Sequence, residues 1–149
     1  MSRLTIRESG GFTLIEILVA VAIIGIIATQ GLSTFQSYLK KAKSVEGEQA
    51  LSELRRLEEL YFNTNLQYSG DLPTVGWNPR APLKYYSLTI ELDGPGPPPF
   101  FYRVIATANL DSDPDLDAWV LTMDMNRSPS MQHGCIPGGV GAVKFDCVD

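Results

Sequence analysis

The sequence has little of what most catalytic and metal-binding domains use. It holds one histidine, His133, and two cysteines, Cys135 and Cys147, and their spacing matches no zinc-ligand pattern. It contains no Walker loop and no HExxH, CxxC or GxSxG motif. His133 stands in a polar stretch and is interpreted as a surface or loop residue. These absences argue against an enzyme and against a resident cofactor.

Positive charge is also scarce. The sequence has 12 lysines and arginines and 17 aspartates and glutamates, so the formal net charge is −5, and the pI is near 4.8. A nucleic-acid-binding face needs clustered basic residues, and none is visible, so no specific nucleic acid partner is predicted. The length of 149 residues suits one compact domain plus an anchoring element.

Proline is missing between residues 12 and 63, and the chain there has helical character. Residues 12–32 are nearly all apolar and span about 31 Å as a helix, which is enough to cross a membrane. Beyond them, one helix face carries apolar residues spaced 4, 3 and 4 apart, namely Ala50, Leu54, Leu57 and Tyr61. Charged residues, Glu58 among them, are expected around that face. The pattern predicts one helix of about 50 residues that ends near residues 63–65.

After a loop at 64–83, three runs alternate between apolar and polar residues, at 84–92, 100–108 and 118–126. Alternation with period two is typical of a sheet with one covered face. In the third run, Trp119, Leu121, Met123 and Met125 are expected on that face. Trp77 and Trp119 are interpreted as core or loop anchors. The predicted class is α+β, with the long helix packed on a three- or four-stranded antiparallel sheet.

The start of the apolar run carries a specific motif, Gly11-Phe12-Thr13-Leu14-Ile15-Glu16, followed by ILVAVAIIGIIA. It resembles the class III signal of type IV prepilins and of type II secretion pseudopilins. The resemblance implies that a prepilin peptidase removes residues 1–11, cuts between Gly11 and Phe12, and methylates the new amino terminus of Phe12. Residues 12–39 would then form the helix of the membrane and the filament core, and residues 40–149 the globular pilin head.

Glu16 is the one charge inside the apolar run. A carboxylate in the middle of a membrane helix costs about 2.5–3.5 kcal/mol on insertion scales, so its presence needs a reason. The resemblance implies that Glu16 meets the free amine of a neighbouring subunit and sets the axial register of assembly. The alternative is a glutamate that is solvated at the headgroup boundary.

The resemblance implies a type IVa-like pilin, major or minor. Its partners would be further copies of itself, other pilins, the prepilin peptidase, the pilus assembly machinery and the membrane. The subunit would first span the inner membrane once with its head in the periplasm. It would then enter an extracellular filament for adhesion, twitching motility or DNA uptake. The alternatives are a type II secretion pseudopilin and a membrane-anchored enzyme or receptor that keeps its helix uncut.

Two features of the head carry further predictions. With the head outside the cytoplasm, Cys135 and Cys147 read as one disulfide, against the alternative of two free thiols, and the resemblance implies that they bound the D-region of pilins. A calcium site is predicted between the second and third runs, where four acidic residues alternate in DSDPDLD: Asp111, Asp113, Asp115 and Asp117. Their spacing is not that of an EF-hand, and the alternative is a solvated acidic turn.

Overall fold

A computed structural model describes residues 11–78, 82–92, 101–111 and 113–147. The chain divides into two compact units, Met1–Tyr38 and Leu39–Asp149, and each is considered by itself. The sequence also predicts a proline-rich turn at 93–99, between the first two alternating runs, and these residues lie outside the described ones.

One helix, α1, runs from Leu14 to Asn65 and has 52 residues. Its end matches the prediction, because the next residue, Leu66, adopts a positive φ of 58° and its N–H closes back on the carbonyl of Phe62 at 2.8 Å. A left-handed residue after the last turn is a common way to end a helix and to satisfy its free carbonyls. The side-chain amide of Asn65 also donates to the carbonyl of Tyr61 at 3.0 Å.

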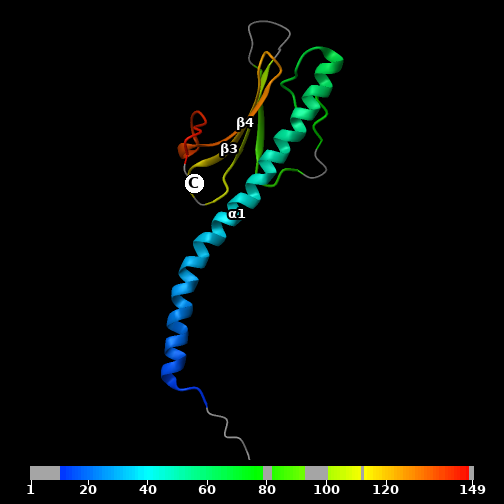
Figure 1. Cartoon of the computed structure of the whole chain (residues 1–149). Helices are drawn as coiled ribbons and strands as arrows, with labels where there is room; N and C mark the ends of the chain where they lie inside the picture. The colour runs from blue at the N-terminus through cyan, green and yellow to red at the C-terminus, as the bar shows by residue number, and fades with distance from the viewer. Residues whose placement is uncertain (1–10, 79–81, 93–100, 112, 148–149) are drawn as a thin grey trace, which may run out of the picture. The chain divides into compact units, whose positions relative to one another are not determined.

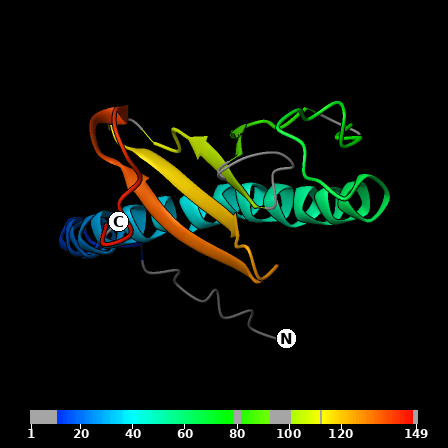
Figure 2. The same ribbon diagram turned by 90° about the horizontal axis from the view of Figure 1, so that it is seen from above.

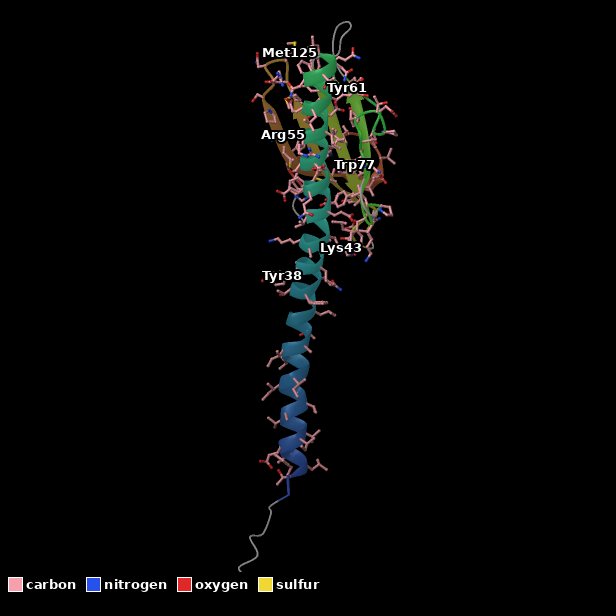
Figure 3. The ribbon with its side chains drawn as sticks, turned by 90° about the vertical axis from the view of Figure 1, so that its right-hand side faces the viewer. Tyr38, Lys43, Arg55, Tyr61, Trp77 and Met125 are labelled. Carbon is pink, nitrogen blue, oxygen red and sulfur yellow. A yellow bond between two sulfur atoms is a disulfide. The ribbon has the colours of Figure 1, made fainter. Side chains whose placement is uncertain are left out.

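In the first unit, α1 is apolar and exposed on all sides. None of its most apolar 18-residue window is buried, and its length and composition are sufficient to cross a membrane. Figure 3 shows the side chains before Tyr38 pointing outward in several directions from the helix. The helix is continuous through residues 29–33, and the hydroxyl of Thr29 donates to the carbonyl of Ile26 at 2.8 Å.

In the second unit, residues 39–65 of α1 pack on one face of a four-stranded sheet. The strands are β1 (Ser87–Leu92), β2 (Tyr102–Ala108), β3 (Leu116–Met123) and β4 (Pro129–Ile136). All neighbours are antiparallel in the order β1-β2-β3-β4, so the sheet is a simple meander. β3 and β4 run obliquely across the helix (Figure 1, Figure 2). The α+β class is confirmed.

The predicted faces are largely as expected. Ala50 and Leu54 are buried, and Leu57 and Tyr61 pack against the core. In β2, every second residue is buried, from Tyr102 to Ala108. The core is completed by Leu51 of α1 and by residues of other segments, chiefly Tyr68, Tyr86, Leu121 and Met123.

Three expectations were wrong. Met125 is 72% exposed, because β3 ends at Met123 and the chain turns there. His133 lies in β4 and not in a loop, while its side chain is exposed, as expected for a surface residue. Glu58, expected among the charged residues around the apolar face, is fully buried.

Close contact between helix and sheet depends on Gly47. A Cβ placed on this residue would lie 2.8 Å from the ring of Tyr86 and 3.0 Å from the ring of Trp119. These distances are below normal van der Waals contact, so only glycine lets the two rings lie this close to the helix backbone.

Candidate functional site

The predicted processing site precedes α1. Gly11 is exposed and lies outside the helix, and nothing lies within 4 Å of the position that its Cβ would occupy. Phe12 is 83% exposed. The bond between Gly11 and Phe12 is therefore accessible to a protease, while cleavage and methylation at this bond stay predictions.

Glu16 and Thr13 form a capping box at the start of α1. Glu16 Oε2 accepts hydrogen bonds from the backbone N–H of Thr13 at 3.0 Å and from its hydroxyl at 2.9 Å. In return, the backbone N–H of Glu16 donates to the Thr13 hydroxyl oxygen at 3.4 Å. This arrangement satisfies backbone donors that a helix start leaves free, and it places a negative charge where the helix dipole favours one.

The capping box leaves Glu16 able to accept a second partner. Among the described residues, Oε1 of Glu16 makes no hydrogen bond, whereas Oε2 is held by Thr13. Thr13 was not singled out from the sequence, although the spacing T-x-x-E before an apolar run is the sequence signature of a capping box. The geometry can thus orient the carboxylate toward a cation that approaches the start of the helix.

Cys135 and Cys147 form a disulfide that joins β4 to the C-terminal segment, with their Cα atoms 5.9 Å apart. The segment is also held by its backbone, because Cys135 and Lys144 exchange two N–H···O bonds of 2.8 Å. Gly134 permits this approach, since a Cβ there would lie 2.3 Å from the carbonyl oxygen of Lys144. The C-terminal loop is therefore fixed along the edge of β4.

The four predicted calcium ligands turn toward different partners. Asp111 forms an ion pair with Lys40, which holds the pKa of its carboxyl below its usual range. Asp113 accepts the N–H of Asp115 at 2.9 Å, and Asp115 accepts the N–H of Gly138 at 2.7 Å.

The fourth carboxylate, Asp117, lies in β3 and accepts hydrogen bonds from Tyr86 and at 2.7 Å from Nε2 of His133. Within the described ranges, which omit residue 112, no three histidine, cysteine or acidic side chains converge as metal ligands do. Calcium binding stays a prediction.

His133 belongs to a polar link between the sheet and the helix. Its ring stacks on that of Trp119 with centroids 4.4 Å apart. The indole of Trp119 in turn donates to the hydroxyl of Ser44 in α1 at 2.9 Å. Trp119 is therefore an anchor of the core, as expected, and Trp77 also packs against it.

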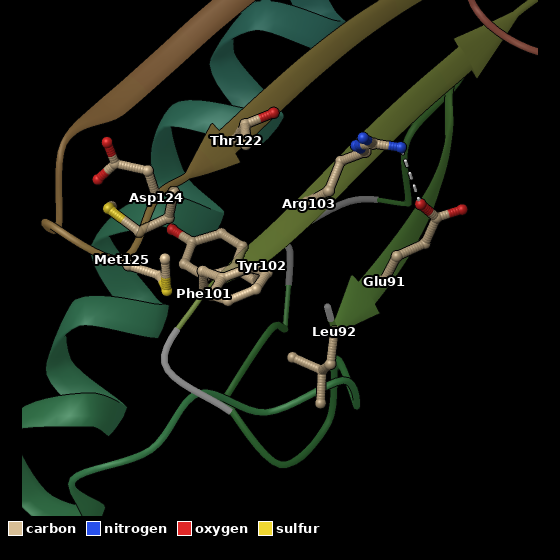
Figure 4. A pocket seen from close by; sticks show the side chains of 9 residues that line it. Glu91, Leu92, Phe101, Tyr102, Arg103, Thr122, Asp124 and Met125 are labelled. Carbon is tan, nitrogen blue, oxygen red and sulfur yellow. Dashed lines mark hydrogen bonds and ion pairs between the residues drawn. The ribbon is translucent and has the colours of Figure 1, made fainter. Parts of the chain in front are cut away.

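A hollow of about 390 Å³ opens at the end of the sheet where β1 ends, β2 begins and β3 turns toward β4 (Figure 4). The described residues that line the hollow are mainly apolar and include Leu92, Phe101 and Met125. An ion pair beside it joins Arg103 to Glu91 across 3.5 Å. Among the described residues that line this hollow, no nucleophilic side chain is paired with a base. These residues therefore form no catalytic arrangement.

Comparison with known proteins agrees with the N-terminal geometry. The family described as "Prokaryotic N-terminal methylation motif" matches residues 6–29. The chain is similar to the type IV major pilin protein PilA of Myxococcus xanthus (strain DK1622), with 32% identity over 75 residues. The match covers 50% of this chain and 34% of that protein, so the chain spans about a third of the length of the curated relative that it matches. No solved structure matches the chain.

Proposed function

Because this chain carries the prokaryotic N-terminal methylation motif and is similar to a type IV major pilin, we propose that it is a structural subunit that polymerises into a type IV pilus. The observation that carries the proposal is the exposed apolar stretch of α1, the first part of which lies within the matched methylation motif, residues 6–29. A folded head attached to such a helix is suited to scaffolding.

The exposed apolar helix needs an apolar surrounding both before and after assembly. Transfer of a leucine or isoleucine side chain from water to an apolar surrounding gains roughly 1.5–3 kcal/mol, so many such residues on one helix cannot remain in water. We expect lipid to cover them in the stored subunit, with the head in the periplasm. Neighbouring helices would cover them in the filament.

Processing would prepare the helix for this exchange. Removal of residues 1–11 by the prepilin peptidase would create a new amine at Phe12, four residues before Glu16. An incoming subunit would bring its Phe12 amine to the carboxylate of Glu16 in a neighbour. Each subunit would then contribute one donor and one acceptor. This is a heterologous contact that generates an open helical polymer.

The pilus role is favoured over the alternatives by the named relative, which is a major pilin, and by the C-terminal loop closed by Cys135 and Cys147. The filament would serve adhesion, twitching motility or DNA uptake. A type II secretion pseudopilin shares the N-terminal motif but would occur in a short periplasmic fibre. A membrane-anchored receptor would keep residues 1–11.

The test is mass spectrometry of filaments sheared from the cell surface, combined with mass spectrometry of the membrane fraction. We expect the sheared filaments to contain this chain without residues 1–11 and with one added methyl group on Phe12. A processed and methylated chain found only in the cell envelope would support the pseudopilin instead. A chain that keeps Met1 in both fractions would overturn the proposal.

A further inference from the structure

Glu58, near the end of α1, is the one charged side chain that is buried among the described residues, with no measurable exposure. Burial of an ionised carboxylate without a partner is costly, because the protein interior cannot replace its hydration. A carboxylate at this position therefore needs neighbouring groups that compensate its charge.

Compensation is incomplete. Glu58 Oε2 accepts the backbone N–H of Ser69 at 3.1 Å, but Oε1 has no hydrogen-bond partner. The hydroxyl of Tyr102 in β2 is also buried without a partner. Two polar atoms are thus left unsatisfied in one region of the core.

The charged and titratable groups around Glu58 do not supply a cation. From α1 these groups are Arg55, which is exposed, and Glu59. The others are Tyr68 in the segment after the helix, Tyr102 in β2, and Arg127 in the turn between β3 and β4.

Arg127 is already engaged, because its guanidinium donates to Glu59 Oε2 at 2.5 Å. The other oxygen of Glu59 accepts the hydroxyl of Tyr68 at 2.9 Å. Glu59 is therefore satisfied, whereas Glu58 has no counter-ion among the described residues. Burial raises the pKa of Glu58 to about 7. The hydrogen bond from Ser69 opposes that rise, and the charge of Glu59 adds to it.

Residues 66–71, which we call the cover segment, close this part of the core. Tyr68 is buried and contacts Phe62 and Tyr102 with ring centroids 4.6 and 4.7 Å apart. The segment begins with Leu66, which is 68% exposed. Among the described residues, its hydrogen bonds to side chains of the helix come from the hydroxyl of Tyr68 and the backbone N–H of Ser69. A short segment with few anchors opens more easily than the sheet.

We propose that Glu58 is a proton-operated latch for the cover segment. With a proton, the neutral carboxyl stays buried beneath Tyr68, and the segment is closed. Without it, the carboxylate is stabilised by water, which reaches Oε1 only when residues 66–71 lift away. The latch itself does not depend on the pilus assignment. Only its exposure to the pH of the surrounding medium rests on the proposed function.

The direction of the pH effect follows from linkage. The closed form binds its proton more tightly than the open form, in which Glu58 is hydrated and has an ordinary carboxyl pKa near 4.5. The closed state is therefore fully favoured below about pH 4.5. It is progressively lost as the pH rises to about 7, and the effect levels off above that.

The test is hydrogen–deuterium exchange of the full chain in detergent micelles from pH 4.5 to 8, corrected for the intrinsic exchange rate. In the wild type, we expect the opening constant of residues 66–71 to rise about tenfold per pH unit up to about pH 7. Peptides from β2 should show a much smaller change. Glu58→Gln keeps the shape of the protonated side chain and should remove the pH dependence in the cover segment.

Glu53→Gln is the matched control, because Glu53 is an exposed acid on the same helix that pairs with Arg56. It should retain the wild-type pH profile. A wild-type profile that is flat for residues 66–71, or one that persists in Glu58→Gln, would overturn the latch. If Glu58→Gln does not fold, the comparison of residues 66–71 with β2 in the wild type still decides the question.

Discussion

The indole N–H of Trp119 donates a hydrogen bond of 2.9 Å to the hydroxyl of Ser44, and this contact joins β3 to α1 across 75 positions of the sequence. The indole can reach the helix because Gly47, one turn further along, carries no side chain. The approach of helix and sheet is thus set by a glycine and a tryptophan together.

The first prediction concerns Gly47. Gly47→Ala adds a Cβ at 2.8 Å from the Tyr86 ring and should lower the free energy of unfolding of the head by about 1–3 kcal/mol, despite the better helix propensity of alanine. Chemical denaturation in micelles, followed by Trp119 fluorescence, measures the change. Gly31→Ala is the control, because nothing lies within 4 Å of its Cβ position. A stabilised Gly47→Ala variant would contradict this account of the contact.

The second prediction concerns Glu46, whose carboxylate accepts the backbone N–H groups of Lys84, Tyr85 and Tyr86 at 2.8, 2.7 and 3.2 Å. Hydrogen bonds to charged groups contribute about 1.5–3 kcal/mol, and loss of the acceptor leaves donors unsatisfied. We expect Glu46→Ala to destabilise the head by about 3 kcal/mol in urea unfolding. Glu48→Ala, which removes an exposed acid on the same helix, should change stability by less than about 0.5 kcal/mol.

Both contacts show how far the sequence alone could lead. The continuous helix was predictable, because the absence of proline and the spacing of Ala50, Leu54 and Leu57 each favour it over a long range. β1, β2 and β3 were predictable from alternation, which is clearest in β2. β3 also buries Ala118 and Val120 on the face opposite to Leu121 and Met123, and the alternation did not indicate this. The hydrogen bonds that Glu46 accepts from residues 84–86 could not be predicted, because these partners lie 38 to 40 residues away in the sequence.

β4 was missed for a physical reason. Its first five residues carry little apolar pattern, and only Gly134, Cys135 and Ile136 are buried. The strand is specified by its pairing with β3 and by the disulfide-bonded segment beside it, which are both non-local. The burial of Glu58 was missed although the sequence carried a signal for it. Glu58 stands seven residues after Leu51 and four after Leu54, and therefore on the same helix face as these two buried leucines.

The third prediction concerns global stability and pH. Because the pKa of Glu58 rises to about 7 in the folded head, unfolding releases its proton at intermediate pH. Stability should therefore decrease as pH rises from about 4.5 to 7, with a loss of about 3 kcal/mol from this group if the whole head stays closed. Urea unfolding at several pH values measures the slope. In Glu58→Gln, the loss of unfolding free energy between pH 4.5 and 7 should be smaller by that amount. An unchanged loss would assign the effect to other groups.

The fourth prediction concerns the disulfide. Reduction, or the double substitution Cys135→Ser with Cys147→Ser, should lower the stability of the head by roughly 3 kcal/mol on the chain-entropy estimate for a loop of this length. The backbone pairing of Cys135 with Lys144 should also weaken, so residues 140–147 should lose protection from hydrogen exchange before β2 does. Equal melting temperatures with and without reductant would show that the backbone bonds alone hold the loop.

The last prediction separates the two roles of Glu16 and is measured in the full chain. Thr13→Val removes the hydroxyl but keeps the charge of Glu16, so the first turn of α1 should fray, at a cost of about 1 kcal/mol. Glu16→Gln keeps a side-chain oxygen that accepts from Thr13 but removes the charge. Hydrogen exchange of residues 14–17 in micelles reports the helix start, and the yield of sheared filaments reports assembly. If the charge of Glu16 pairs with the amine of a neighbour, Glu16→Gln should abolish filaments while the helix start stays protected. Thr13→Val should instead expose the helix start and reduce the yield only in part. Normal filaments from Glu16→Gln would mean that the carboxylate serves the helix start alone.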